Sequence, residues 1–313
     1  MTKLLVIDAD TILYSSAAQQ QDNKCNAIHK ASGREKLFPS KTDFNKWLAS
    51  QEKWTKDEFE FQTVSSVTGE ARFAFQTIKQ KVENIINAAY CEDFVVCIEG
   101  EGNFRKDYET PYVQYKAQRP EKPILFNECR EFFIKKYKDR VILSEGRETD
   151  DTCNILAWGS YNKATASRRR SDADVVLSFV DKDLKANSRG WLLNYNKLEE
   201  GIFWNDALSQ TRAYLIQCLI GDSADHIQGI KFLADSTKLK YGIKVKGCGP
   251  ASAEKILSVD SEREMAMRVE EAYREAHPED WKQRLQDNAF FLYLQRYAGE
   301  VFTWEKYVEG LTE

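Results

Sequence analysis

Four short apolar runs in the first half of the chain have the pattern of buried strands. They are rich in β-branched side chains and do not alternate with polar residues, which is typical of strands covered on both faces of a parallel sheet. The runs are Leu4–Ile7, Phe94–Ile98, Val141–Leu143 and Val175–Val180. Stretches with helical spacing lie between them, at about 71–90, 126–137 and 150–162. This alternation predicts an α/β fold with a mostly parallel, doubly wound sheet flanked by helices.

The second half of the chain has a different pattern. Two further short strands are expected at Trp191–Leu193 and Gly201–Trp204, followed by a helix at about 206–220 and a mainly helical stretch from 250 to 313. We therefore expect a boundary near residue 205, with one domain at 1–205 and a second at 206–313. The aromatic residues of the tail are expected to be core. Residues 21–70 are polar and yield no assignment, and the basic run Arg168–Arg170 is expected on a solvated loop.

Each of the four strands is followed by acidic residues. The carboxyl ends of parallel strands meet at one edge of a sheet, which is where ligands bind in such folds. Acids in the first turn of a helix are also stabilised by the helix dipole, so those at the start of the 150–162 helix have a purely structural explanation as well. That explanation does not account for the other strands. The acids of this set, together with two in the segment 221–225, are Asp8, Glu99, Glu148, Asp150, Asp151, Asp181, Asp183, Asp222 and Asp225.

Gathering these carboxylates in one pocket has an electrostatic cost. Two like charges ~4 Å apart repel by about 4 kcal/mol at an effective dielectric constant near 20. Bound divalent cations relieve that repulsion, and ligands with oxygen donors only favour Mg²⁺ or Mn²⁺ over zinc. Two such ions ~3.5–4 Å apart activate water and stabilise the leaving oxygen of a phosphodiester. The pattern therefore indicates a two-metal hydrolytic site.

The overall charge permits a nucleic-acid partner. The net charge is −4, but removing the nine acids above from the 49 Asp and Glu leaves 40 against 45 Lys and Arg. Three dispersed histidines and seven cysteines without a CxxC pair argue against a histidine-rich metal site, a zinc framework or disulfides. The chain has no apolar run of membrane-spanning length and no signal-peptide pattern, so we expect a cytoplasmic protein.

Several motifs follow one another in an order that resembles the 5′-nuclease (flap endonuclease) superfamily, particularly the 5′→3′ exonucleases and RNase H-like members encoded by phages. They are VIDADTILYSSA (6–17), CIEGEGNFRKDY (97–108), YKAQR (115–119), ETDD (148–151), VDKD (180–183), GDSAD (221–225) and GCGPASAEKIL (247–257). The resemblance implies a PIN-like α/β domain with a helix–hairpin–helix type DNA-binding module at about 221–258. It also implies the cytoplasm of a phage-infected host and a role in phage DNA replication or recombination.

The resemblance also implies roles for the acids. Asp8, Glu148, Asp150 and Asp181 match ligands of the more tightly held of two Mg²⁺ ions, for which Mn²⁺ can substitute. The second group is Asp151, Asp183, Asp222 and Asp225. Relatives carry Asp where this chain has Glu99, and Glu101 competes with it for that role. Asp10 has an alternative explanation as a cap of the following helix.

Residues 104–125 match the clamp or arch region of the family. Cations there neutralise phosphates and aromatic rings stack on unpaired bases, and the family's YK motif assigns the contact with the scissile phosphate to Lys116, supported by Arg105. Pro111, Pro120 and Pro123 interrupt the region, so we expect a small or open arch. The residues expected to contact DNA here are Arg105, Lys106, Tyr115, Lys116 and Arg119.

Gly247 and Gly249, at the start of a helix that contains Lys255, match the hairpin that grips duplex phosphates and often holds K⁺ in relatives. Residues 231–245 form an insertion before this hairpin. The expected activity is Mg²⁺-dependent hydrolysis from a 5′ end of duplex or flapped DNA, with the RNA strand of a hybrid as a further candidate substrate.

Three alternatives remain open. A haloacid-dehalogenase-like phosphatase would use Asp8 as its nucleophile, but it leaves ETDD, VDKD and the hairpin without a role. A non-catalytic, structure-selective DNA-binding relative is a second alternative, and a single-strand-specific PIN ribonuclease is a third.

Overall fold

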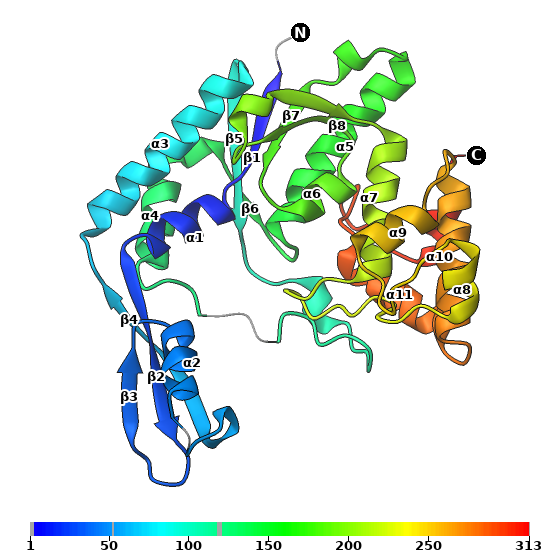
Figure 1. The fold of residues 1–313 in the computed structure, drawn as a ribbon. Coiled ribbons are helices and arrows are strands. Elements are labelled where there is room, and N and C mark those ends of the chain that lie inside the picture. The colour runs from blue at the N-terminus through cyan, green and yellow to red at the C-terminus, as the bar shows by residue number, and fades with distance from the viewer. Residues whose placement is uncertain (1–2, 52, 118–120, 313) are drawn as a thin grey trace. The chain divides into compact units, whose positions relative to one another are not determined.

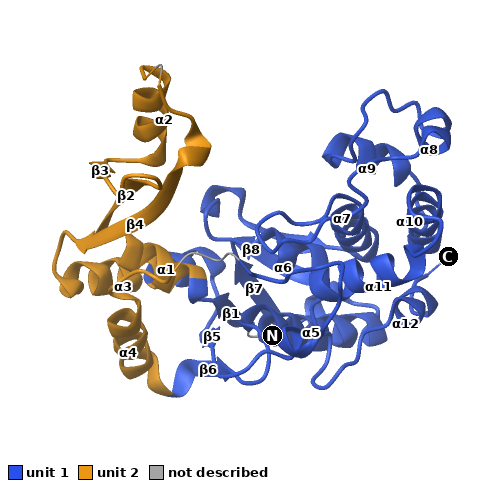
Figure 2. Ribbon diagram, turned by 90° about the horizontal axis from the view of Figure 1, so that it is seen from below, with its two compact units in different colours: residues 1–10, 83–120, 139–313 blue, residues 11–82, 121–138 orange. Residues whose placement is uncertain are grey.

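The computed structural model describes residues 3–51, 53–117 and 121–312, and the chain divides into two compact units (Figure 2). Unit 1 consists of residues 1–10, 83–120 and 139–313, and unit 2 of residues 11–82 and 121–138. Residues on both sides of position 205 lie in unit 1, so the domain boundary expected there stays a prediction. No described helix is long and apolar enough to cross a membrane.

A six-stranded sheet forms the centre of unit 1 (Figure 1). Its strand order is β6-β5-β1-β7-β8-β9, and all neighbours are parallel except β8 and β9. The strands are β1 (Leu4–Asp8), β5 (Asp93–Glu99), β6 (Val141–Ser144), β7 (Val175–Phe179), β8 (Gly190–Asn194) and β9 (Ile202–Asn205). The predicted α/β class with a mostly parallel sheet is therefore confirmed.

The central strands are buried because their apolar runs face protein on both sides. Leu5, Val6 and Ile7 of β1 are inaccessible to solvent, and every residue of β7 is buried. Helix α5 (Thr149–Ser167) packs on five of these strands, from β6 to β8. The N-terminus of α5 therefore lies at the sheet edge where the parallel strands end, and α6 (Lys182–Asn187) begins at the same edge directly after β7.

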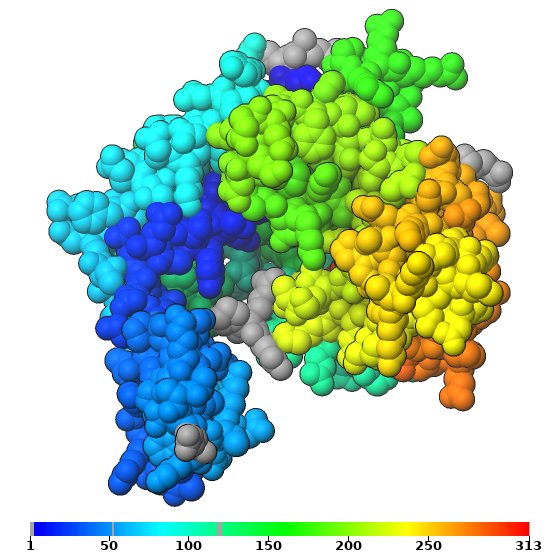
Figure 3. All heavy atoms as spheres, in the orientation of Figure 1, coloured from blue at the N-terminus to red at the C-terminus, as the bar shows by residue number. Residues whose placement is uncertain are grey.

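The C-terminal part of unit 1 is helical, as expected. A single apolar cluster joins its helices, with Tyr214, Val269 and Ala289 among the fully buried members. In Figure 3 the surface around α8 (yellow) lies against α10 (orange), and Ser236 donates a hydrogen bond of 2.8 Å to Glu275 there. The helices are α7 (Ala207–Ile220), α8 (Asp235–Lys240), α9 (Pro250–Ile256), α10 (Glu262–Ala276), α11 (Trp281–Leu292) and α12 (Trp304–Glu309).

Unit 2 contains a three-stranded antiparallel sheet in the region for which the sequence gave no assignment. Its order is β3-β2-β4, with α2 packed on β2 and β3. Phe44 of α2 makes ring contacts with Phe38 of β3 and Phe59 of β4, at centroid distances of 5.5 and 5.2 Å. The elements of this module are β2 (Gln21–His29), β3 (Glu35–Phe38), α2 (Lys41–Ala49) and β4 (Phe59–Val67).

The remaining helices of unit 2 agree closely with the expected bounds. The helix predicted at 126–137 is α4 (Phe126–Tyr137), and that predicted at about 71–90 is α3 (Ala71–Ala89), which continues into unit 1. Helix α1 (Asp10–Ala18) follows β1. Helix α5 of unit 1 runs to Ser167, five residues beyond the expected end, and the run Arg168–Arg170 follows it in an exposed connection to β7, as expected. Arg168 is the left-handed C-cap of α5, and Arg170 begins a 3₁₀ turn (Arg170–Asp172).

Candidate functional site

A pocket of about 150 Å³ lies at the edge of the sheet in unit 1 where the parallel strands end. Six carboxylates from three segments of the chain line it, together with two lysines, one tyrosine and apolar side chains from α11 and the residues after it. The carboxylates are Glu148, Asp150, Asp181, Asp183, Asp222 and Asp225. The other lining residues are Tyr115, Lys116, Lys182, Ala224, Phe291, Leu292 and Leu294.

Local helix chemistry positions four of the acids. Glu148 is the N-cap of α5, and Asp150 lies in its first turn. Asp181 is the N-cap of α6 and accepts a hydrogen bond of 2.9 Å from the backbone N–H of Asp183. Acids are favoured at helix N-termini because unpaired N–H groups and the helix dipole stabilise negative charge. The same acids therefore stabilise the starts of two helices and line the pocket.

Burial and neighbouring carboxylates raise the pKa values of three aspartates at this edge of the sheet. Burial together with the charges of Asp10 and Asp181 raises the pKa of Asp8 to about 8, and Asp8 itself is only 2% exposed. Burial, followed by the charges of Asp8 and Asp181, raises the pKa of Asp150 well above its ordinary value. Burial and Asp181 raise the pKa of Asp183 to about 7, although Gln217 donates a hydrogen bond to it. The cluster therefore carries more negative charge than its protein surroundings neutralise.

Glu148 differs from these aspartates because cations surround it. Burial alone would raise its pKa, but the charges of Lys116 and Arg105 outweigh that effect and hold the pKa at about 2. Lys116 pairs directly with Glu148, and Tyr115 donates a hydrogen bond of 2.8 Å to the same carboxylate. Asn103, which the sequence analysis did not identify, donates another of 3.0 Å. Glu148 is thus an ionised carboxylate that positions Lys116 at the pocket.

Arg105 and Asp151 form a buried ion pair and do not line the pocket. Arg105 is 1% exposed and Asp151 is fully buried. The guanidinium donates two hydrogen bonds to the carboxylate, of 2.6 and 2.8 Å, and a third to the carbonyl of Tyr293. Asp151 also accepts the backbone N–H groups of Gln295, at 2.9 Å, and Glu148, at 3.1 Å. The pair fastens the start of α5 to the segment after α11, and the metal-binding and DNA-binding roles expected for the two residues stay predictions.

The GDSAD segment folds into a tight loop after α7. Gly221 has φ of +75°, and a Cβ there would lie 2.2 Å from the carbonyl oxygen of Ile227, so only glycine fits. The N–H of Asp222 bonds to that carbonyl at 2.8 Å. Lys182 forms an ion pair of 2.8 Å with Asp222 and, with the N–H of Ala224, lowers its pKa against the effect of burial. This loop brings Asp222 and Asp225 to the pocket, as the resemblance implied.

Asp10 and Glu99 lie at the same sheet edge but do not line the pocket. Asp10 accepts a hydrogen bond of 3.0 Å from the backbone N–H of Glu99 and another from the hydroxyl of Thr149. It thereby connects β5, the start of α1 and the start of α5. Glu99 is exposed, and the N–H of Glu101 bonds to Glu145 at 2.8 Å. The metal-binding role expected for Glu99 or Glu101 stays a prediction.

The expected DNA-binding residues lie in several environments. Lys106 is exposed in a 3₁₀ helix (Phe104–Asp107), and Tyr115 stacks on Phe291 with ring centroids 4.8 Å apart. Lys116 has φ of +54° and lies 3.8 Å from Asp225 through its ammonium group. Arg119 lies outside the described residues. The roles of these residues stay predictions.

The hairpin predicted around residues 247–255 begins α9. Gly249 is the N-cap of α9, with Pro250 in its first turn. Gly247 forms a bridge with Phe232, so the insertion 231–245 starts and ends beside the hairpin. Lys255 donates a hydrogen bond of 3.2 Å to the carbonyl of Gly242 within that insertion. Binding of duplex DNA and of K⁺ at this hairpin stays a prediction.

The acidic side chains of the pocket offer oxygen ligands only, which fits Mg²⁺ or Mn²⁺ in ligand chemistry. The raised pKa values of Asp8 and Asp183 indicate negative charge that a cation would stabilise. Among the described residues, however, no three His, Cys, Asp or Glu side chains already stand close enough together to hold an ion. The donor set therefore fits a divalent metal chemically, but it is not assembled into a coordination sphere.

Sequence and structure comparisons identify no close relative. No protein-family model matches the chain, and no curated protein matches it. A bacteriophage T5 protein crystallised with metal ions aligns over 92% of this chain and 99% of its own, with a TM-score of 0.40 and 12% identity. The bacteriophage T5 flap endonuclease in a complex with DNA and metal ions gives 93% and 99% coverage, a TM-score of 0.39 and 12% identity. A mutant of the T5 5′-exonuclease gives 93% and 100% coverage, a TM-score of 0.39 and 11% identity. Likenesses this weak carry no argument about function.

Proposed function

We propose that this chain is a divalent-metal-dependent 5′ nuclease that hydrolyses phosphodiester bonds of duplex or flapped DNA. One observation carries the proposal: six carboxylates and two lysines meet at one small pocket at the carboxyl edge of a parallel sheet. The pocket contains oxygen donors for cations and, beside them, ammonium groups for a phosphate. A site for a neutral or cationic ligand would not need both.

Bound divalent cations would supply an activated water and neutralise charge on the phosphate. Asp150, Asp181 and Asp183 would hold them, with Asp8 buried behind. Lys116 already lies beside Glu148 and Asp225. A phosphate entering the pocket would accept a hydrogen bond from the ammonium group of Lys116 in place of one of these carboxylates. Lys182, paired with Asp222, would do the same on the other wall.

Arg105 and Asp151 act in this proposal as positioning residues. Their buried bonds fix Glu148 and the start of α5, and Glu148 in turn orients Lys116. We therefore place neither the guanidinium on the substrate nor the Asp151 carboxylate on a metal. Asp8 is 2% exposed and its pKa is raised to about 8, so it is a poor nucleophile, which argues against the phosphatase alternative.

The test uses duplex, 5′-flapped and RNA–DNA hybrid substrates labelled at either the 5′ or the 3′ end, with Mg²⁺ or with EDTA. We expect 5′-end-dependent products in Mg²⁺ and none in EDTA. Asp150→Asn and Asp181→Asn should lower cleavage by ~10²-fold or more while DNA binding survives. Glu199→Gln, an exposed acid outside the pocket, is the matched control. Full activity of either aspartate variant, or activity in EDTA, would refute the proposal.

Binding of DNA without any cleavage in Mg²⁺ or Mn²⁺ would instead favour the non-catalytic binder. Cleavage confined to single-stranded RNA would favour the PIN ribonuclease.

A further inference from the structure

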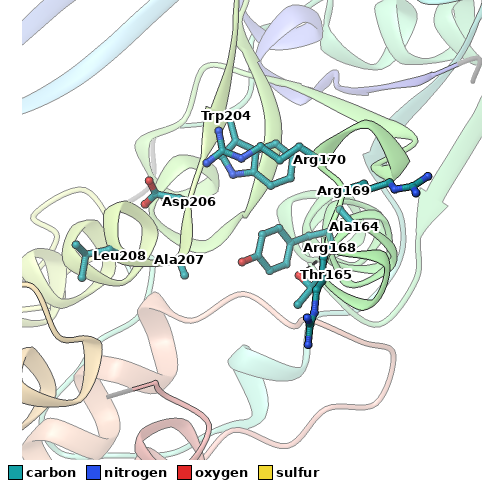
Figure 4. A pocket seen from close by; sticks show the side chains of 10 residues that line it. Ala164, Thr165, Arg168, Arg169, Arg170, Trp204, Asp206, Ala207 and Leu208 are labelled. Atoms are coloured by element: carbon teal, nitrogen blue, oxygen red, sulfur yellow. Dashed lines mark hydrogen bonds between the residues drawn. The ribbon is translucent and has the colours of Figure 1, made fainter.

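The run Arg168–Arg170 borders an open hollow of about 380 Å³ that the proposed nuclease site does not use. The hollow lies between the C-terminal end of α5 and the start of α7, with Tyr161 and Trp204 in its wall (Figure 4). The acid pocket is at the other end of α5. Because α5 has 19 residues and rises ~1.5 Å per residue, the two sites are separated by roughly 27 Å.

The three arginines lack the acidic partners that several arginines of unit 1 have. Arg105, Arg140 and Arg189 each pair with a carboxylate. Within the described part of the chain, no carboxylate lies within ion-pair distance of the guanidinium of any residue of the run Arg168–Arg170, and all three are exposed. Unpaired guanidinium groups gathered at a hollow are donors available to an anion.

Backbone geometry holds the arginines at the rim. Arg168 has φ of +58° as the C-cap of α5, so the chain turns there and the next two residues leave the helix axis. The guanidinium of Arg170 lies 5.2 Å from the ring centroid of Trp204, and its carbonyl accepts a hydrogen bond of 3.2 Å from Trp191. Figure 4 shows Arg170 extended along Trp204, with Arg168 and Arg169 pointing outward.

The rings of the aromatic wall pack against one another. Trp204 packs edge-on against Trp191, with centroids 5.0 Å apart, and lies 5.8 Å from Tyr161. The one acid in the lining, Asp206, is engaged as the N-cap of α7 and accepts a hydrogen bond of 2.8 Å from the N–H of Ser209. The hollow thus combines free cations with aromatic rings and contains one carboxylate that is already bonded.

We infer that this hollow binds single-stranded nucleic acid, with the arginines on phosphates and an unpaired base against the aromatic wall. A guanidinium matches the geometry of a phosphate, and unpaired bases stack on aromatic rings in a sequence-tolerant way. An acidic peptide would satisfy the arginines but would make no use of the aromatic rings that line the hollow. The inference rests on the proposed function, because it makes the hollow a second anchor for the nuclease's substrate strand.

The separation of the two sites sets a length requirement. A stacked strand rises ~3.4 Å per nucleotide, so a strand cut at the acid pocket needs roughly 8 nucleotides to reach the hollow. A single-stranded 5′ arm of 4 nucleotides is too short, whereas an arm of 20 nucleotides can occupy both sites. Short-armed substrates therefore act as an internal control for folding and for the chemistry.

The test compares Arg168→Gln/Arg169→Gln with Lys135→Gln/Lys136→Gln, which removes the same charge from exposed positions of α4. The arginine variant should raise KM severalfold for flapped DNA with the 20-nucleotide arm and leave KM for the 4-nucleotide arm unchanged. In EDTA, the salt dependence of its binding to a fluorescent oligothymidine of 20 nucleotides should fall by ~0.7 in slope per lost phosphate contact, about 1.4 in total. The lysine variant should match the wild type in both measurements.

Equal KM values for the arginine variant and wild type on the long arm would overturn the inference while leaving the proposed function intact. Equal losses in the two variants would do the same, because bulk charge would explain them. Decaglutamate bound by the wild type in preference to oligothymidine, and lost in the arginine variant, would assign the hollow to an acidic protein segment. If the wild type cleaves no substrate but the arginine variant loses oligothymidine binding, the proposed function fails and the binding site stands.

Discussion

Replacing Asp151 by alanine should destabilise the protein through the buried arginine that it leaves behind. Removing one partner of a buried ion pair typically costs 3–5 kcal/mol, because the other charge stays buried without compensation. Asp151 accepts two guanidinium bonds and two backbone N–H groups, all inside the protein. Arg105 would keep its bond to the Tyr293 carbonyl and its distance of 3.7 Å to Glu148. These remaining contacts favour the lower part of the range, about 3–4 kcal/mol.

Urea unfolding in EDTA at pH 7 measures this loss without any contribution from bound metal. With a slope m of ~3 kcal/mol/M, the midpoint should fall by about 1 M while m stays unchanged. The matched control is Asp93→Ala, which breaks the pair with Arg140. Those side chains are 63% and 45% exposed, so the midpoint should scarcely move.

Two results would refute this reasoning in different ways. If Asp151→Ala and Asp93→Ala had the same midpoint, burial of the pair would have no energetic consequence. If Asp151→Ala matched the wild type in EDTA but gained nothing from added Mg²⁺, Asp151 would be the metal ligand that the sequence resemblance implies.

Other predictions concern charge and backbone strain. Asp8 keeps its proton in the folded protein up to about pH 8, whereas its ordinary pKa is 3.8. The folded state therefore binds more protons than the unfolded state, so the stability of the metal-free protein should fall by on the order of 5 kcal/mol as the pH rises from about 4 to about 8. Urea midpoints across that range should flatten in Asp8→Asn, and a flat wild-type profile would contradict the shift. Mg²⁺ at ~100 times its Kd should stabilise the wild type by about 2.7 kcal/mol, seen as a rise in Tm, and an equal rise in Asp150→Asn would show that the ion binds elsewhere. Gly221→Ala should cost more than ~2 kcal/mol in the same unfolding assay, because its Cβ would meet the Ile227 carbonyl at positive φ. Gly159→Ala, in an open helical position, should instead gain ~0.5–1 kcal/mol, and the reverse order would refute the steric argument.

The sheet and the location of the acid pocket could be predicted because both depend on local pattern. The run Leu4–Ile7 is buried on both faces, as its lack of alternation indicated. Parallel pairing then places the acids after successive strands at one edge, and helix starts at Glu148 and Asp181 fix their direction. No long-range contact had to be known for these steps.

The different environments of Asp150 and Asp151 could be predicted in part. Adjacent residues of a helix point about 100° apart, so the two carboxylates could not both face one pocket. The partner of Asp151 could not be predicted from the sequence, because Arg105 lies 46 residues away and Tyr293 is 188 residues from Arg105. Such contacts arise where the segment after α11 packs beside the start of α5. The periodicity of the sequence carries no information about that packing.

Residues 21–70 escaped prediction because their sheet has one thin core and many exposed positions. Six successive residues of β4, Gln62–Val67, are exposed, so the strand shows no alternation of apolar and polar positions. Aromatic contacts hold the module together, such as those of Trp47 with Phe38 and Trp54. Those contacts depend on the tertiary structure and leave no periodic pattern in the sequence.

The pairing of β2 with β4 makes this module a self-contained segment of the chain. Its first residue, Gln21, is the cross-strand partner of its last, Val67, so the chain enters and leaves at neighbouring points. A segment closed in this way can open and close as one cooperative unit, and its amide hydrogens should exchange at a common rate, separate from that of β1 and β7. It can also be cut out and its two ends joined by a short turn, which makes residues 21–67 a removable insertion in the architecture of this protein.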